Sequence, residues 1–276
     1  MSRESWGCSG LGVRYGGTVA LQDVSFEAPA GAVAAVVGGD GAGKTTLLRA
    51  LAGTVQPSAG TVRRPDVRRL GYVSAGPGVW SDLTVEENLS FSGRAYGLGA
   101  DELGRRIAGL LERTGLTGAR DRLAGRLSGG MRQKLALAMA VAHQPDLLIL
   151  DEPTTGVDPV SRAELWRLLA GAAAGGAAVV VATTYLDEAE RAATVLVLDR
   201  GRSLLAGTPD EVLAATPGLV VEGPARPDGL PAWRRGARWR AWSSGGSTPP
   251  GTGAAAFDLE DAVIVAQLRQ HQGRAA

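Results

Sequence analysis

The sequence predicts an α/β fold with parallel strands in its central sheet, and three observations predict it. A valine-rich run at 32–37 has the character of a buried strand, and a glycine-rich turn leads from it into a helix-forming run at 47–52 that ends at Gly53. A second apolar run at 147–150 ends in an acidic pair. Strand and helix patterns then alternate to residue 214, as is typical of a parallel sheet covered by helices.

The composition describes a globular chain with a substantial core. Its 276 residues allow one large domain or two small ones, 45% are hydrophobic, and the formal net charge is +1. A charge so near zero gives no reason to expect nucleic acid or an anionic membrane as a partner. The single Cys8 excludes a disulfide framework, and residues 1–5 lack the apolar core of a signal peptide, so we expect a cytoplasmic protein.

One uncharged run has nearly the length needed to cross a bilayer. Residues 168–186 carry no charge, and about 20 apolar residues make a membrane span. Three glycines and many alanines interrupt the run, so we interpret it as a helix end, a glycine turn and a strand at 177–182. A role at a membrane would then require a partner chain.

The glycine-rich turn fits the pattern G-x-x-x-x-G-K-[ST], in which backbone N–H groups cradle a phosphate at the start of a helix. A glycine turn with a chance lysine is the alternative, and the flanking strand and helix favour the phosphate-binding loop. Lys44 would reach the terminal phosphates, and the Thr45 hydroxyl would hold Mg²⁺. The residues expected to bind ATP here are Gly38, Gly39, Asp40, Gly41, Ala42, Gly43, Lys44, Thr45 and Thr46.

Before this loop, apolar and polar residues alternate around 11–15 and over 20–27, which predicts an antiparallel sheet. Tyr15 lies in the first of these runs. An aromatic ring near a nucleotide site can stack on a base, and an ordinary strand aromatic would look the same. The residues alone leave both interpretations open.

After the loop, a stretch with proline and glycine at 57–65 precedes a predicted strand at 70–73. Helical patterns at 85–89 and 101–113 follow, the second with acidic residues in its first turn. They indicate a helical insertion in the α/β core, over about 82–145.

Near the end of this insertion, Ser128 is a natural N-cap for a helix over 132–143. Gly129 and Gly130 follow it and allow another group to approach the backbone closely. Alone, these residues need be no more than the capped start of a helix.

The acidic pair Asp151–Glu152 follows the strand predicted at 147–150. Ligands bind at the carboxyl ends of parallel strands, so Asp151 would support Mg²⁺ and Glu152 would orient or activate the attacking water. Side chains alternate in direction along a strand, which gives the two carboxylates different roles. A solvated acidic turn is the weaker alternative, because the phosphate-binding loop already predicts a carboxylate here.

The composition changes beyond Pro217, where Pro, Gly, Ser and Arg dominate to about residue 256. We therefore expect one domain over 1–216, which carries the phosphate-binding loop, and a C-terminal extension over 217–276. Arginines and tryptophans interleave over 232–242, a run that can form a small hairpin. Such a run can bind nucleic acid by stacking, and cation–π packing on a small sheet is the preferred explanation. A helical pattern resumes at 258–270.

Three motifs then follow one another in a specific order: the phosphate-binding loop, LSGGM at 127–131 and LLILDEPTTGVDP at 147–159. Over about residues 8–214 the chain resembles the ATP-binding subunits of ABC transporters. The resemblance implies a P-loop NTPase core of the RecA-like type, with an N-terminal antiparallel β-subdomain and a helical insertion that carries LSGGM. MRQK at 131–134, YLDEAE at 185–190 and the tail around 258–262 are similar to the branch that exports drugs and antibiotics.

The resemblance implies two cassettes facing head to tail, each ATP lying between the phosphate-binding loop of one and the LSGGM of the other. Tyr15 would stack on adenine, Glu152 would be the hydrolytic carboxylate, and Asp158 would lie at the dimer seam. The helical insertion, with residues 76–80, would receive an integral-membrane transporter subunit at the inner face of the cell membrane. The residues expected to contact the partner's ATP are Ser128, Gly129, Gly130 and Met131.

Two positions depart from the family pattern. Ala75 stands where the family usually has a glutamine of the metal and water network, and Thr184 stands where it usually has a histidine that contacts the γ-phosphate. A threonine hydroxyl can hydrogen-bond a phosphate but is never cationic, and alanine can do neither. These changes suggest a largely non-hydrolysing partner for a second, intact cassette. The retained Glu152 favours the alternative, a homodimer that tolerates both substitutions.

A third possibility is an ABC protein that works on ribosomes or DNA. The translation-linked type usually carries two cassettes in one chain, and the DNA type has long coiled coils. This sequence shows neither feature, so we expect no nucleic-acid partner.

Overall fold

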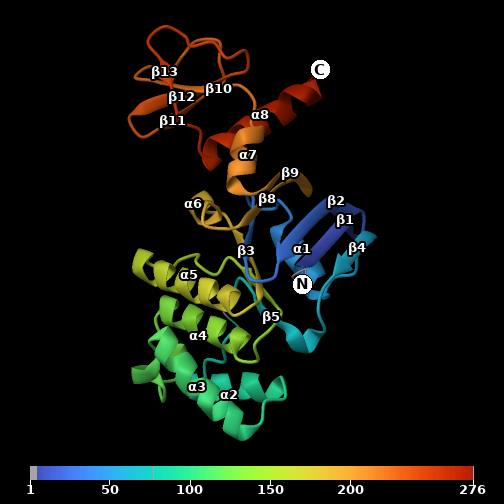
Figure 1. Ribbon diagram of the computed structural model, residues 1–276, viewed down its shortest axis with the longest axis vertical. Coiled ribbons are helices and arrows are strands. Elements are labelled where there is room, and N and C mark those ends of the chain that lie inside the picture. Colours follow the sequence, from blue (N-terminus) through green and yellow to red (C-terminus); the bar gives the residue numbers. More distant parts are fainter. Residues whose placement is uncertain (1–4, 77, 276) are drawn as a thin grey trace.

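The computed structural model describes residues 5–76 and 78–275, and it arranges them in layers around one central sheet (Figure 1). Helices α2 and α3 lie at one end of the molecule with α4 next to them, and a small C-terminal sheet lies at the opposite end. The N-terminal stretch examined for a signal peptide lies largely outside the described residues, as does Pro77 in the segment expected to receive a membrane subunit.

The central sheet has six strands in the order β5-β6-β7-β3-β8-β9. The first five are parallel, and β9 pairs antiparallel to β8 at the edge. This arrangement confirms the predicted α/β fold. The strands are β3 (Val33–Val37), β5 (Leu70–Val73), β6 (Leu147–Asp151), β7 (Ala178–Thr183), β8 (Thr194–Asp199) and β9 (Arg202–Gly207).

Strands β6 and β7 are buried along their whole lengths, as expected for central parallel strands covered on both faces. The uncharged run at 168–186 divides between the end of helix α5 (Pro159–Ala174), a turn at Gly175 and Gly176, and β7. Our interpretation of this run is therefore confirmed. Within the described residues, none of the helices has both the length and the apolar character that a membrane span requires.

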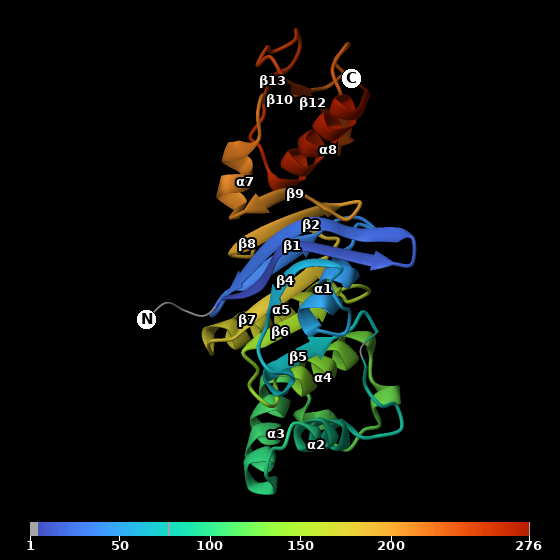
Figure 2. The same ribbon diagram turned by 90° about the vertical axis from the view of Figure 1, so that its right-hand side faces the viewer.

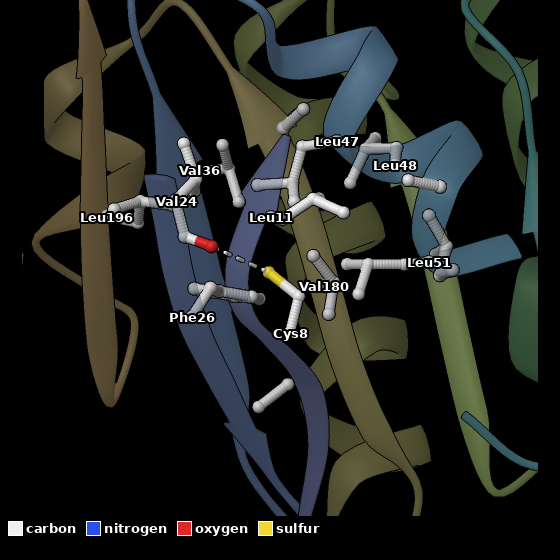
Figure 3. Packing of buried hydrophobic residues seen from close by; sticks show 14 of the residues in the cluster. Cys8, Leu11, Val24, Phe26, Val36, Leu47, Leu48, Leu51, Val180 and Leu196 are labelled. Carbon is white, nitrogen blue, oxygen red and sulfur yellow. Dashed lines mark hydrogen bonds between the residues drawn. The ribbon is translucent and has the colours of Figure 1, made fainter. Parts of the chain in front are cut away.

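A second, antiparallel sheet lies over one face of the first and has the order β2-β1-β4. The strands β1 (Ser5–Tyr15) and β2 (Thr18–Pro29) were predicted, whereas β4 (Ala59–Arg63) lies in the stretch at 57–65 for which we predicted no strand. Apolar side chains from this sheet, from helix α1 (Lys44–Ala52) and from the central strands form one core (Figure 3). The Cys8 thiol is buried there and donates to the Val24 carbonyl oxygen.

The opposite face of the central sheet is covered by α4 (Gly129–Val141) and α5, which share a second apolar core. Helices α2 (Val85–Ala95) and α3 (Ala100–Thr114) pack on the outer side of α4 around a third core. Thr84 and Glu87 form a capping box that starts α2. Short 3₁₀ turns at Val67–Arg69, Thr117–Ala119 and Ala124–Arg126 connect these elements.

The C-terminal part forms a four-stranded sheet with the order β11-β12-β10-β13, which the sequence did not predict in full. Figures 1 and 2 show α7 and α8 between this sheet and the central one. The arginines of the hairpin pair mainly with carboxylates: Arg235 contacts Asp258, and Arg240 contacts Glu222. The elements are α6 (Leu186–Ala189), α7 (Pro209–Ala215), β10 (Leu219–Gly223), β11 (Ala232–Arg235), β12 (Arg238–Ser243), β13 (Gly253–Ala254) and α8 (Leu259–Ala275).

Candidate functional site

The phosphate-binding loop joins the end of β3 to the start of α1, at the carboxyl edge of the central sheet. Two of its glycines cannot be replaced without movement. A Cβ on Gly38 would lie 2.5 Å from the Leu198 carbonyl oxygen, and Gly43, the N-cap of α1, has φ 109° and would place a Cβ 2.7 Å from Leu21. Neighbouring residues thus fix the conformation of the loop. The first residues of α1 line a cavity, so the free N–H groups at the start of this helix face it.

This cavity has a volume of about 490 Å³. Loop residues 39–46 form its floor, Thr18, Val19 and Ala20 of β2 form a wall, and Glu152 and Arg200 complete the lining. Gly38, a predicted binding residue, is not among the lining residues. Arg200 was not among the predicted site residues; it lies in the turn after β8, with φ 47°, and adds a second cation to the cavity.

Lys44 is held under the loop, with only 5% of its side chain exposed. Its Nζ donates to the carbonyl oxygens of Gly38 at 2.8 Å and Gly39 at 3.3 Å, and it lies 3.3 Å from Glu152 Oε1. A buried ammonium group needs such partners, because burial without them is very costly. These contacts hold the lysine charge at the lining of the cavity, beside the loop.

Asp151 ends β6 and is almost fully buried. Burial raises the pKa of this carboxyl group, the Glu152 charge adds to the rise, and a hydrogen bond from Thr45 opposes it. Its Oδ1 has no hydrogen-bond partner in the part of the chain that the structure describes. A buried carboxylate oxygen beside a threonine hydroxyl is a donor set of the hard oxygen type that Mg²⁺ prefers, so the residues fit this ion.

Glu152 is one residue further and turns toward the cavity. Its φ of 50° is rare for a residue other than glycine, and such strain is common at functional sites. Its backbone N–H donates to the Ala182 carbonyl oxygen at 2.9 Å, and its carboxylate accepts a hydrogen bond from Thr155 Oγ1 at 3.3 Å. These contacts hold the carboxylate beside Lys44.

Ser128, Gly129, Gly130 and Met131 do not line this cavity. Ser128 Oγ accepts a hydrogen bond from the Met131 N–H and so caps α4. A Cβ on Gly129 would meet nothing within 4 Å, whereas one on Gly130 would lie 2.8 Å from Ser161 Oγ. The start of α4 is therefore open toward solvent at Gly129 and packed against α5 at Gly130.

The remaining predicted residues also lie outside the cavity lining. Tyr15 is 47% exposed and pairs with Thr18, next to the β2 wall. Asp158 caps α5 by accepting hydrogen bonds from Val160 N and Ser161 N. Ala75, after β5, and Thr184, after β7, are both exposed.

Comparison of the chain with known proteins identifies its family. Residues 21–155 match the family model described as ABC transporter. The chain is also 38% identical over 237 residues to the Nod factor export ATP-binding protein I of Ralstonia nicotianae, and the alignment covers 82% of this chain and 73% of that protein. The chain belongs to the ABC transporter family.

Other ABC proteins extend the comparison. The chain is 41% identical over 215 residues to the probable multidrug ABC transporter ATP-binding protein YbhF of Escherichia coli, which covers 73% of this chain. It is 40% identical over 215 residues to the daunorubicin/doxorubicin resistance ATP-binding protein DrrA of Streptomyces peucetius, which covers 74% of this chain. The chain spans 37% of YbhF and 65% of DrrA.

Solved ABC structures share the fold. An ATP-binding subunit of an ABC transporter matches with a TM-score of 0.70 at 30% identity and covers 76% of this chain and 92% of its own. The protein cbiO1 from Clostridium perfringens, described as part of the ABC transporter complex cbiONQ, matches with a TM-score of 0.69 at 30% identity, covering 78% of this chain and 92% of its own.

Proposed function

We propose that this chain is the ATP-binding subunit of an exporter, and that it binds and hydrolyses ATP with Mg²⁺ to drive transport through a separate membrane protein. One observation carries the proposal: Lys44 and Glu152 meet at the floor of the cavity, with Asp151 and Thr45 directly beside them. A cation for phosphates, oxygen ligands for a metal and a carboxylate for water are the groups that phosphoryl transfer to water needs.

Each residue has a distinct task in this scheme. The loop N–H groups and Lys44 bind the phosphates, and Thr45 and Asp151 hold Mg²⁺, which when bound neutralises charge on the phosphate oxygens. Glu152 leaves Lys44 once phosphates neutralise the lysine, and its carboxylate is then available to orient a water molecule and accept its proton. Tyr15, exposed beside the β2 wall, stacks on the adenine.

A second cassette completes the site. Ser128, Gly129, Gly130 and Met131 lie outside the chain's own cavity, and the open start of α4 is a ready site for an anion. We propose that they contact ATP held by the facing cassette, and that Asp158 lies at the seam between the two.

The helical part offers a surface to the membrane partner. Trp80 and Phe91 are large apolar side chains, about half exposed, with ring centroids 4.4 Å apart. An exposed aromatic pair is typical of protein–protein contact sites. We propose that it receives the transporter subunit and holds this chain at the inner face of the cell membrane. The relatives YbhF and DrrA favour a drug or antibiotic as the exported cargo.

A second candidate function follows from Ala75 and Thr184. Ala75 follows β5 and Thr184 follows β7, at the positions where the family uses glutamine and histidine. Alanine has no polar group for the metal and water network, and threonine cannot supply a cation to the phosphates. In this alternative the chain holds ATP passively and completes the active site of a different cassette with Ser128–Met131.

ATP hydrolysis by the purified chain distinguishes the two functions. The first predicts Mg²⁺-dependent turnover that Glu152→Gln abolishes and Lys44→Ala abolishes together with ATP binding. The second predicts ATP binding, lost in Lys44→Ala, without turnover until a second cassette is added. Absence of ATP binding by the natural chain contradicts both.

A further inference from the structure

Two side-chain hydrogen bonds, both made by Thr183, hold the turn that carries Thr184. Thr183 Oγ1 accepts a hydrogen bond from the Tyr185 N–H at 3.0 Å and donates one to Glu188 Oε2 at 2.7 Å. Thr183 and Glu188 are both fully buried. Because each bond is made by a group that water cannot reach, the position of Thr184 depends on the position of Glu188.

Arg162, in the first turn of α5, is the cation that faces this buried glutamate. Its Nε lies 3.7 Å from Glu188 Oε1, and its guanidinium carbon lies 4.4 Å from the ring centroid of Tyr185. Neither Arg162 Nε nor Glu188 Oε1 has a hydrogen-bond partner within the described ranges. The two charges therefore attract each other without forming a hydrogen bond. A shift of about 1 Å that brings Arg162 Nε toward Glu188 Oε1 would form a charge-assisted hydrogen bond.

The other end of this connection is the proposed dimer seam. The Arg162 N–H donates to the Asp158 carbonyl oxygen at 2.9 Å, in the turn that the Asp158 side chain caps. Ser161, next to Arg162, is packed against Gly130 at the start of α4. A movement of the first turn of α5 thus moves Arg162 relative to Glu188.

We propose that Arg162 is a positioning residue that transmits closure of the cassette dimer from Asp158 to the turn carrying Thr184. Closure brings Arg162 Nε onto Glu188 Oε1, and Glu188 then fixes Thr183 and Tyr185, which places Thr184 toward the phosphates. Thr184 has no charge to draw itself to a phosphate, so its placement depends on this connection. The inference rests on the proposed function for the parts played by Asp158 and Thr184.

The kinetic test is a double-mutant cycle on the full chain. Arg162→Met and Glu188→Gln should each lower kcat for ATP about tenfold, the effect of losing one hydrogen bond to a charged group, with KM changed less than twofold because neither residue lines the cavity. The double variant should be no slower than either single one, and Arg162→Lys should recover part of the rate. Arg167→Met, an exposed arginine of the same helix, is the control and should leave kcat unchanged.

Amide exchange at Tyr185 tests the connection without hydrolysis. Asp158→Ala removes the cap of α5 and should speed exchange of the Tyr185 N–H several-fold in the natural chain, and should add nothing in Arg162→Met. If Asp158→Ala has the same effect in both backgrounds, or if the two kinetic effects add fully, the proposal is wrong. If the natural chain does not hydrolyse ATP and the exchange coupling is present, hydrolysis by this chain alone is rejected and the connection stands.

Discussion

The ion pair between Lys44 and Glu152 makes the most specific prediction. Two unit charges 3.3 Å apart attract by about 5 kcal/mol at an effective dielectric constant near 20. Desolvation offsets much of this, and Glu152 is 25% exposed, so we expect Glu152→Gln to cost the nucleotide-free chain about 1–2 kcal/mol of stability.

The same substitution should strengthen ATP binding. Phosphates must displace the carboxylate from Lys44, and a neutral amide competes less, so we expect an affinity about five- to tenfold higher, or roughly 1–1.4 kcal/mol. Thermal unfolding measures the first effect, and calorimetric titration with ATP, without Mg²⁺ so that nothing turns over, measures the second. Glu164→Gln, which breaks an ion pair with Lys134 outside the cavity, is the matched control.

Equal stability and equal ATP affinity in Glu152→Gln would refute this reasoning, because Glu152 would then not restrain Lys44. Glu152→Asp keeps the charge and should fall between the natural chain and Glu152→Gln in both measurements.

Three further predictions concern the core, the buried thiol and the exposed aromatics. Trp166→Ala empties a buried site in the core under α5 and should lower the free energy of unfolding in urea by about 3–5 kcal/mol. Burial raises the pKa of Cys8 from 9.0 to about 11. Between pH 9 and 11 only the unfolded chain loses the thiol proton, so the free energy of unfolding should fall by up to about 1.4 kcal/mol per pH unit. Cys8→Ala should lack this decline. Trp80→Ala with Phe91→Ala should leave ATP hydrolysis by the isolated chain unchanged and prevent its copurification with the membrane subunit.

Local patterns in the sequence were sufficient to predict much of the fold. The phosphate-binding loop lies between a strand and a helix as predicted. A valine-rich run, fixed glycines and a helix-forming run follow one another within about 20 residues, so local sequence alone determines this unit. Strand β4 was missed because Ala59–Arg63 has little apolar character and owes its conformation to pairing with β1. The edge strand β9 was also missed: Leu204 and Leu205 are adjacent apolar residues and do not alternate with polar ones, and the strand forms by pairing with β8 immediately before it.

The candidate site shows a similar division. Lys44 and Asp151 were found because their motifs have strict spacing. Arg162 was missed, since its partners Tyr185 and Glu188 are more than 20 residues away and only the packing of α5 beside β7 brings them together. Nor could the sequence show that Glu152 pairs with Lys44 before nucleotide arrives, because that contact depends on an unusual φ at one residue.

Complementation between two inactive variants tests the central claim, an ATP site shared by two chains. Lys44→Ala removes the phosphate-binding lysine and keeps Ser128. Ser128→Asp keeps an N-cap for α4 and places a negative charge against the ATP of the partner. Each variant alone should hydrolyse no ATP.

In a mixture, the mixed dimer has one intact site, built from the loop of the Ser128→Asp chain and the Ser128 of the Lys44→Ala chain. When the two variants are mixed in equal amounts, about half of the dimers are mixed, and one of the two ATP sites in each mixed dimer is intact. The account therefore predicts about a quarter of the natural rate. A mixture as inactive as its components would contradict it, because the site would then lie within one chain.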